Sequence, residues 1–217
     1  MISHQGQLDL LKAVSNVMGK DVSCFAFGGN AMIFYGYKAE TKDIDLVFAK
    51  PEERKQFITA LEKLGFESFD PVTIYVPKKM KDPSKPVMYR KEDARFDLFA
   101  GRIFRTLLSE RMTEDIFALH EFRGKHTLKV HVMRKEHIFL LKAVTNRDRD
   151  LEDMTLILEK EKRFDWQYVV DEAIWQHQHG DSWVLLDLEE KMRQLKEYAF
   201  IDEKYLKQIY RAQGGKR

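Results

Sequence analysis

The stretch FAFGGNAMIFYGYKAETKDIDLVF, residues 25–48, decides the fold class that we predict for this chain. The apolar run 24–27 predicts a short buried strand, and the glycine pair 28–29 predicts a sharp turn. Residues 30–35 then predict a helix, after which residues 43–48 alternate between acidic and apolar side chains. That alternation is typical of a strand with one buried face, so the order strand, turn, helix, strand predicts an α/β (α+β) fold.

Two acidic residues, Asp43 and Asp45, occupy alternate positions of the second predicted strand. Side chains at i and i+2 of a strand point to the same face, so we expect the two carboxylates side by side while Ile44 and Leu46 enter the core. Two like charges at one place call for a cation. A hard divalent ion such as Mg²⁺ takes oxygen ligands from carboxylates, substrate phosphates and water, which predicts a metal site for phosphoryl transfer.

The turn upstream of these acids suits an anion. We expect Asn30 to be the N-cap of the predicted helix. Backbone N–H groups of Gly28, Gly29 and Asn30 are then expected at a helix start, which is a favourable place for a phosphate group. The turn and the acids together predict a site for a triphosphate and its metal ion.

These residues resemble the nucleotidyltransferase superfamily related to DNA polymerase β. Its signature is a hydrophobic residue, Gly, Gly or Ser, a spacer, Asp-x-Asp and later a third acid on a neighbouring strand. Gly-Gly-Asn-Ala at 28–31 and Thr-Lys-Asp-Ile-Asp-Leu at 41–46 are most similar to the minimal and AbiEii-toxin-like branches. The resemblance is close over 25–48 and extends in outline over 20–160. It implies a nucleotidyltransferase-like mixed β-sheet core flanked by helices.

The third acid is expected at Asp97, in the predicted strand 94–99. Phe96 and Leu98 flank Asp97 there as apolar residues flank the first pair of acids. By resemblance, Asp97 completes the metal site with Asp43 and Asp45 and helps to deprotonate an attacking hydroxyl. The resemblance also implies nucleotide-binding residues beside the acids, namely Gly28, Gly29, Asn30 and Lys42, with Lys38 and Thr41 around them.

A lysine, Lys142, stands in the middle of the apolar segment 137–144, which predicts a core helix. In AbiEii-like relatives a Lys on a helix after the catalytic sheet, followed by Arg-Asp-x-x-Asp, lies near the active site. Lys142 followed by Arg149, Asp150 and Asp153 matches that layout, which implies that Lys142 meets the β- or γ-phosphate. The two acids also stand at a predicted helix start, where the helix dipole favours them, so a purely structural role is the alternative.

The chain departs from the family pattern shortly before Thr41. Relatives often carry Arg at this place, whereas this chain has Ala39 and its nearest cation is Lys38. Lysine cannot reproduce the bidentate contact of arginine. The departure keeps open a second function, a catalytically silent nucleotidyltransferase-fold module that binds a nucleotide or a partner.

The resemblance implies that the protein is a metal-dependent nucleotidyltransferase. Such an enzyme uses Mg²⁺ or Mn²⁺ and transfers a nucleoside monophosphate from an NTP to a hydroxyl acceptor. The acceptor stays open between RNA, a protein and a small molecule. A toxin-like role, with a separate antitoxin as partner, is what the AbiEii-like branch implies.

Composition limits the kinds of function and partner that the sequence allows. The 217 residues carry 37 basic and 35 acidic side chains, for a net charge of +2, which argues against a generic nucleic-acid coat. The basic stretch 78–86 fits a solvated loop, with contact to RNA or an acidic acceptor as the alternative. Cys24 is the only cysteine, so no intramolecular disulfide forms. No apolar run is long enough for a membrane span and no leader is recognisable, so we expect a cytoplasmic protein without a membrane partner.

The remaining pattern predicts an α/β core over 1–135 and a helical region over 136–217. Helices are expected over 6–18 and 51–64, and a strand over 127–133. Further expectations are a hairpin of 72–76 with 87–90, a stretch 102–120 without a clear pattern, and helices from about 150 onward, including 185–198 and 201–210.

Overall fold

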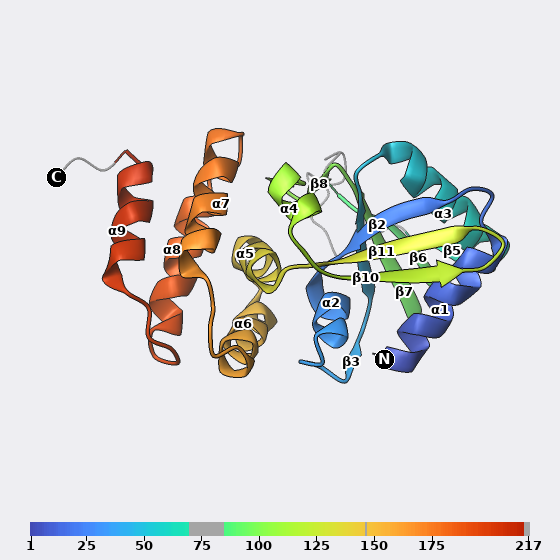
Figure 1. Cartoon of the computed structure of the whole chain (residues 1–217), viewed down its shortest axis with the longest axis horizontal. Coiled ribbons are helices and arrows are strands. Elements are labelled where there is room, and N and C mark those ends of the chain that lie inside the picture. The colour runs from blue at the N-terminus through green and yellow to red at the C-terminus, as the bar shows by residue number, and fades with distance from the viewer. Residues whose placement is uncertain (70–84, 146, 215–217) are drawn as a thin grey trace. The chain divides into compact units, whose positions relative to one another are not determined.

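The computed structural model of the protein is described here for residues 1–69, 85–145 and 147–214 (Figure 1). Its internal contacts define two units. The first comprises Met1–Phe104 and Leu108–Met133, and the second comprises Arg105–Leu107 and Arg134–Arg217. The division at Met133 comes two residues before the domain boundary expected from the sequence, and the short segment Arg105–Leu107 was expected in the first unit.

The first unit contains strands and helices in alternation, as the α/β prediction requires. Its elements are β1 (Ile2–Ser3), α1 (His4–Val17), β2 (Val22–Ala26), α2 (Gly28–Phe34), β3 (Glu40–Thr41), β4 (Ile44–Phe48), α3 (Pro51–Lys63), β5 (Glu67–Phe69), β6 (Val87–Lys91), β7 (Ala94–Ala100), β8 (Arg102–Ile103), α4 (Glu110–Glu114), β10 (Ile116–Arg123) and β11 (Thr127–Met133). With the helices of the second unit, this composition confirms the predicted fold class.

Within the described residues, seven strands form one mixed sheet in the order β10-β11-β2-β4-β7-β6-β5. The pairs β11–β2 and β4–β7 are parallel, and the other neighbours are antiparallel. The parallel pairing of β4 with β7 sets Asp45 opposite Asp97, although the two residues are far apart in the sequence. The sheet order, rather than local sequence, therefore brings the acidic strands together.

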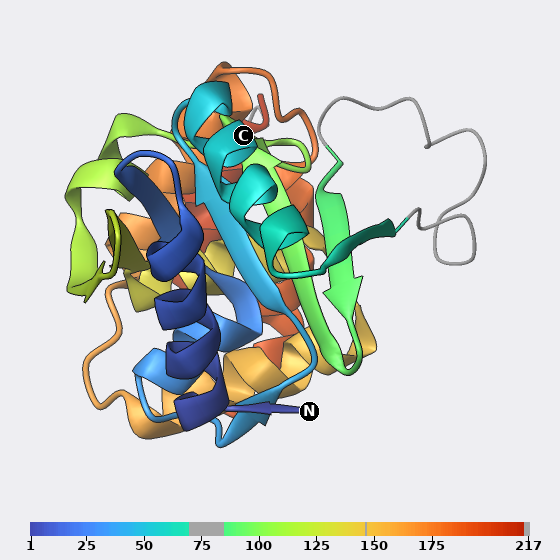
Figure 2. The same ribbon diagram turned by 90° about the vertical axis from the view of Figure 1, so that its right-hand side faces the viewer.

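Helices α1 and α3 lie side by side on one face of this sheet (Figure 2). The core between them and the sheet is aromatic: the Phe57 ring of α3 lies 5.4 Å from Phe48 of β4 and 5.7 Å from Phe96 of β7, measured between ring centroids. All three side chains are fully buried. Burial of a phenylalanine side chain contributes about 1.5–3 kcal/mol, so this packing fixes the apolar face of β4 and β7 inward.

Local signals explain where these two helices begin. Ser3 caps α1, since its hydroxyl accepts a hydrogen bond from the Gly6 N–H at 3.1 Å. Helix α3 begins at Pro51, whose fixed φ suits a first helical position, and it ends before Gly65, which has a φ of 81°. Both helices were predicted, within two residues at each end.

Three expectations differ from the structure or lie partly outside the described residues. Helix α2 begins at Gly28, so Asn30 lies inside the helix and is not its N-cap. Residues 116–123, part of the stretch without a clear pattern, form the strand β10. In the expected hairpin, residues 87–90 belong to β6, which pairs with β5 and β7, whereas 72–76 and most of the basic stretch 78–86 lie outside the described residues.

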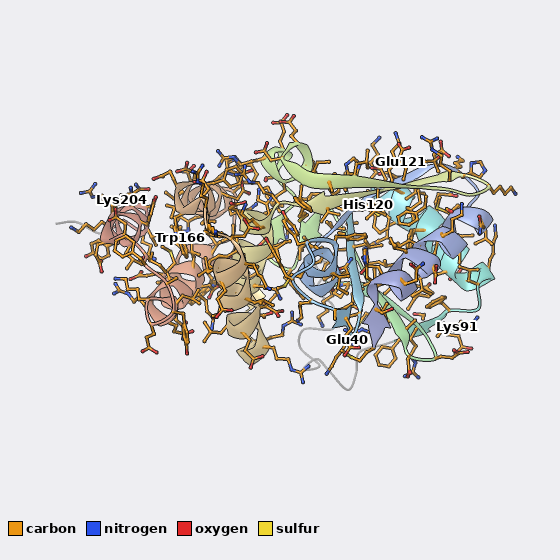
Figure 3. The ribbon with its side chains drawn as sticks, turned by 60° about the horizontal axis from the view of Figure 1, so that its bottom comes forward. Glu40, Lys91, His120, Glu121, Trp166 and Lys204 are labelled. Atoms are coloured by element: carbon orange, nitrogen blue, oxygen red, sulfur yellow. The ribbon has the colours of Figure 1, made fainter. Side chains whose placement is uncertain are left out.

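The second unit is helical, as the pattern after residue 136 predicts. It contains β9 (Thr106–Leu107), α5 (Lys135–Thr145), α6 (Asp148–Lys160), α7 (Trp166–Gln178), α8 (Val184–Leu195) and α9 (Glu203–Ala212). Helix α5 packs against α6, α7 and α8, and α9 packs against α7 and α8. Trp166 lies among these helices (Figure 3), within a buried apolar cluster that includes Phe139, Leu188 and Leu206. In the part of the chain described here, no helix is both long and apolar enough to cross a membrane.

Candidate active site

The site is built on two neighbouring parallel strands, β4 and β7. Asp45 and Asp97 are register partners, and paired residues on neighbouring strands point to the same face of a sheet. Asp43 lies just before the first residue of β4, so the first acid precedes the strand rather than lying within it. The apolar neighbours Ile44 and Leu46 are fully buried on the opposite face, as the alternation predicts. The fold thus places the three predicted acids close together, with Asp43 and Asp45 at the beginning of β4 and Asp97 in the middle of β7.

A cation that we did not predict joins two of these acids. Arg95 precedes Asp97 by two residues on β7 and shares its face. Its guanidinium forms an ion pair with Asp43 through Nη2, and it approaches Asp97 with 2.9 Å from Nε to Oδ1 and 3.2 Å from Nη2 to Oδ2. The Arg95, Asp43 and Asp97 side chains are 28%, 21% and 10% exposed. We call Asp43, Asp45, Asp97 and Arg95 the acid cluster.

Charge and donor chemistry decide what the acid cluster can hold. The cluster contains three carboxylates and one guanidinium, and carboxylates placed close together favour a cation beside them. The donors are carboxylate oxygens, the ligand type that Mg²⁺ and Mn²⁺ prefer. Among the residues described, no three His, Cys, Asp or Glu side chains converge into a metal-binding group. The donors suit a divalent ion by their chemistry, and in this structure Arg95 provides the positive charge between Asp43 and Asp97.

The glycine pair before the acids has a packing role that the structure makes explicit. A Cβ added at Gly28 would lie 2.3 Å from Oδ2 of Asp45, and Gly28 also has a φ of 63°. A Cβ added at Gly29 would lie 2.5 Å from Oγ1 of Thr41. Contacts under 3 Å are not tolerated by a real side chain, so only glycine lets the start of α2 come this close to Asp45 and Thr41.

Asn30 positions the acidic strand from within α2. It is fully buried, and its Oδ1 accepts a hydrogen bond from the Asp45 N–H at 3.1 Å. In addition, the Phe27 N–H donates to the Asp45 carbonyl at 3.3 Å. The backbone of Asp45 is thus held on both sides by the segment that contains the glycine pair. The observed role of Asn30 is to position Asp45, and its predicted contact with a nucleotide stays a prediction.

The other residues predicted near the nucleotide lie on the segment between α2 and β4. Thr41 is buried against Gly29, whereas Lys42 is exposed and Lys38 is half-buried. Ala39, the position where relatives often carry arginine, is exposed. This segment therefore carries lysines and no arginine, and the predicted contacts of Lys38 and Lys42 with a nucleotide stay predictions.

The Lys142 group forms a second ionic cluster, within the helical unit. The Lys142 ammonium on α5 lies 3.3 Å from Oδ1 of Asp150 and 2.5 Å from Oδ2 of Asp153, both on α6. The Thr145 hydroxyl donates to Asp150 at 2.6 Å, and the backbone N–H of Arg147 donates to the same carboxylate at 3.2 Å. We call these five residues the lysine cluster.

Burial and neighbouring charge act against each other in this cluster. Burial by itself would raise the pKa of the Asp150 carboxyl, but Lys142, the Thr145 hydroxyl and Arg147 together outweigh burial and lower that pKa below its ordinary value. The Lys142 and Asp150 side chains are only 6% and 3% exposed. The observed contacts of Lys142 are with its own unit, and its predicted contact with a phosphate stays a prediction.

The predicted site residues thus fall into two groups. The first unit brings together Asp43, Asp45, Asp97, Gly28, Gly29, Asn30 and Thr41. The second unit brings together Lys142, Asp150 and Asp153, while Arg149 is exposed on α6. Arg95 is the residue that sequence reasoning missed, and the signal was present: an arginine two positions before a strand carboxylate shares its face.

Comparison with known proteins adds no family to this geometry. No protein-family model matches the chain, and no curated protein matches it.

Proposed function

We propose that the protein is a metal-dependent nucleotidyltransferase that transfers a nucleoside monophosphate from an NTP to a hydroxyl acceptor and releases pyrophosphate. The observation that carries the proposal is the pairing of Asp45 with Asp97 on parallel strands, with Asp43 joined to the same cluster through Arg95. Carboxylate oxygens gathered on one face of the sheet are ligands suited to a divalent cation. The motif resemblance supports the same chemistry.

The residues take distinct roles in this proposal. Asp43, Asp45 and Asp97 would hold Mg²⁺ or Mn²⁺, which when bound supplies the positive charge that neutralises a transferring phosphoryl group. Asn30 and the glycine pair keep Asp45 in place, so that its carboxylate is preorganised. Asp97 accepts the proton of the attacking hydroxyl, a role suited to a carboxylate within reach of the acceptor. Catalysis is then mainly positioning and charge neutralisation.

One observation favours a second function: Arg95 already forms ion pairs with Asp43 and Asp97. A cluster whose carboxylates are already paired could bind a nucleotide or a protein partner without turnover. Against it stands the presence of three neighbouring carboxylates, because a module without chemistry gains nothing from acids that repel one another.

The test is label transfer. The full chain is incubated with each α-³²P-labelled NTP and Mg²⁺ or Mn²⁺, with total RNA, cell extract protein and small hydroxyl compounds as separate acceptors. We expect transfer that requires the divalent ion and that Asp45→Asn and Asp97→Asn each abolish. The variant Glu121→Gln, on the exposed edge strand β10 (Figure 3), is the matched control and should transfer label like the natural protein.

The outcomes separate the two functions. Transfer that both acid variants abolish establishes the transferase and points to the acceptor class. Nucleotide binding without transfer to any acceptor supports the binding module, and it would be seen as stabilisation of the folded protein by nucleotide. Absence of both transfer and nucleotide binding contradicts the transferase and a module that binds nucleotide, and it leaves only a module that binds a protein partner.

A further inference from the structure

We propose that Arg95 is a built-in competitor of the divalent ion: its guanidinium holds Asp43 and Asp97 in the metal-free protein and must leave them when the metal binds. This inference rests on the proposed function and concerns the same site. It assigns a regulatory role to a residue outside the metal-binding motif.

The competition follows from the atoms that Arg95 contacts. Its Nη2 and Nε lie at hydrogen-bonding or ion-pairing distance from Asp43 and from both carboxylate oxygens of Asp97. These are oxygens that a divalent ion would need, and a metal and a guanidinium cannot share the same lone pairs at close range. Contacts between a guanidinium and carboxylates are among the stronger hydrogen bonds in proteins, so their loss opposes metal binding.

The surroundings of Arg95 allow it to leave. Its side chain is more than a quarter exposed, and a long side chain can move its charged end into water while its backbone stays in the strand. Asp97 is by contrast largely buried, and the backbone of Asp45 is held by Asn30. The acids therefore keep their places while the cation between them can be exchanged.

The experiment measures Mn²⁺ binding to the full chain without nucleotide, by calorimetry and by the loss of the free-ion electron paramagnetic resonance signal. The natural protein is compared with Arg95→Gln, in which the side chain keeps polar character but loses its charge. We expect Arg95→Gln to bind Mn²⁺ about tenfold more tightly, the size expected for removing one competing charged hydrogen-bonded pair. The Arg95→Lys variant keeps a positive charge but lacks the planar guanidinium group. We therefore expect it to bind Mn²⁺ with intermediate affinity.

A matched control removes the same charge from the neighbouring strand. Arg90 on β6 pairs in register with Arg95, but its guanidinium lies over the Phe69 ring, 4.5 Å from the ring centroid. Arg90→Gln therefore reports the general effect of one positive charge fewer near the site. We expect its Mn²⁺ affinity to stay within about twofold of the natural value, because exposed charges interact weakly across water.

The outcomes distinguish this inference from the proposed function. Weaker or unchanged Mn²⁺ binding by Arg95→Gln, with Mn²⁺ bound by the natural protein and lost in Asp45→Asn, overturns the competitor and leaves the metal-dependent function standing. Absence of Mn²⁺ binding in the natural protein and in Arg95→Gln overturns both. If Arg95→Gln does not fold, Arg95→Lys decides, and affinity equal to or weaker than natural overturns the competitor.

Discussion

The acid cluster and the lysine cluster have similar parts and differ in burial. The acid cluster sets three carboxylates beside the guanidinium of Arg95, and its ion-paired side chains are 10% to 28% exposed. In the lysine cluster, Lys142 and Asp150 form a central pair that is only 6% and 3% exposed, while Arg147 contacts Asp150 from the surface. The acid cluster is within reach of water, whereas the central pair of the lysine cluster is enclosed.

The difference teaches how to separate a functional ionic site from a structural one. Burying a charge is costly unless it is paired, so an enclosed cluster must balance its charges within the fold. Charges that water reaches interact more weakly with one another, so a partly exposed cluster depends less on complete pairing and can exchange its partners. We therefore expect the lysine cluster to respond to mutation in stability and the acid cluster to respond in metal binding.

The largest effect is expected for Lys142→Met. This change leaves Asp150 and Asp153 buried without their cation, and breaking a buried ion pair from one side costs about 3–5 kcal/mol. Urea unfolding followed by circular dichroism measures it. Lys191→Met is the matched control, since Lys191 is equally buried but bonds the neutral Gln194, and we expect it to lose about 1 kcal/mol. Similar losses for the two variants would contradict the contrast between the clusters.

The next largest effect is expected for Gly28→Ala, which tests the close approach of α2 to the acid cluster. The new Cβ meets the Asp45 carboxylate, and its backbone has a left-handed conformation, so we expect a loss of about 3 kcal/mol. Gly36→Ala separates the two causes. Gly36 has a φ of 72° with no atom within 4 Å of its added Cβ, so only the backbone term of about 1 kcal/mol remains. Thermal unfolding measures both, and equal losses would mean that the contact with Asp45 is unimportant.

A smaller effect is expected for Asp45→Asn, and it concerns the response of the folded protein to Mn²⁺. The variant should lose any stabilisation that Mn²⁺ gives to the natural protein, as measured by thermal unfolding with Mn²⁺ and with a chelator. Asp153→Asn in the lysine cluster should keep that response and should instead destabilise the protein, because Lys142 loses one of its two partners. An undiminished stabilisation of Asp45→Asn by Mn²⁺ would contradict a role of Asp45 in metal binding.

The smallest effect is expected in the pH dependence of stability. The pKa of Asp150 is lowered in the folded protein, so folding favours its ionised form. Its stabilising contribution is complete above the ordinary aspartate pKa of 3.8 and is lost as the pH falls through the lower folded pKa. Urea unfolding at several pH values below 5 should therefore show a steeper loss of stability for the natural protein than for Asp150→Asn. Equal slopes would contradict the lowered pKa.

Much of the architecture was predictable because it follows from the local periodicity of apolar and polar residues. The alternation around Asp45 and Asp97 predicted two strands with acids on one face, and both strands were confirmed. The strand β10 was missed because it lies at an edge of the sheet, where both faces carry mixed residues and the alternation is weak. The start of α2 was misplaced because asparagine is a common N-cap residue. Here the Asn30 side chain instead accepts a hydrogen bond from the Asp45 N–H.

The sequence by itself determined the two strands that carry the acids, the buried faces of those strands and the carboxylates that share a face, because these depend on residues close together in the chain. Only the tertiary structure decided that Arg95 meets Asp43, 52 residues away, and that Lys142 meets Asp153. Such pairs depend on strand order, register and helix packing, which long-range burial of the whole core selects. The choice of partner for each charge, and with it the balance of each cluster, is therefore a property of the fold.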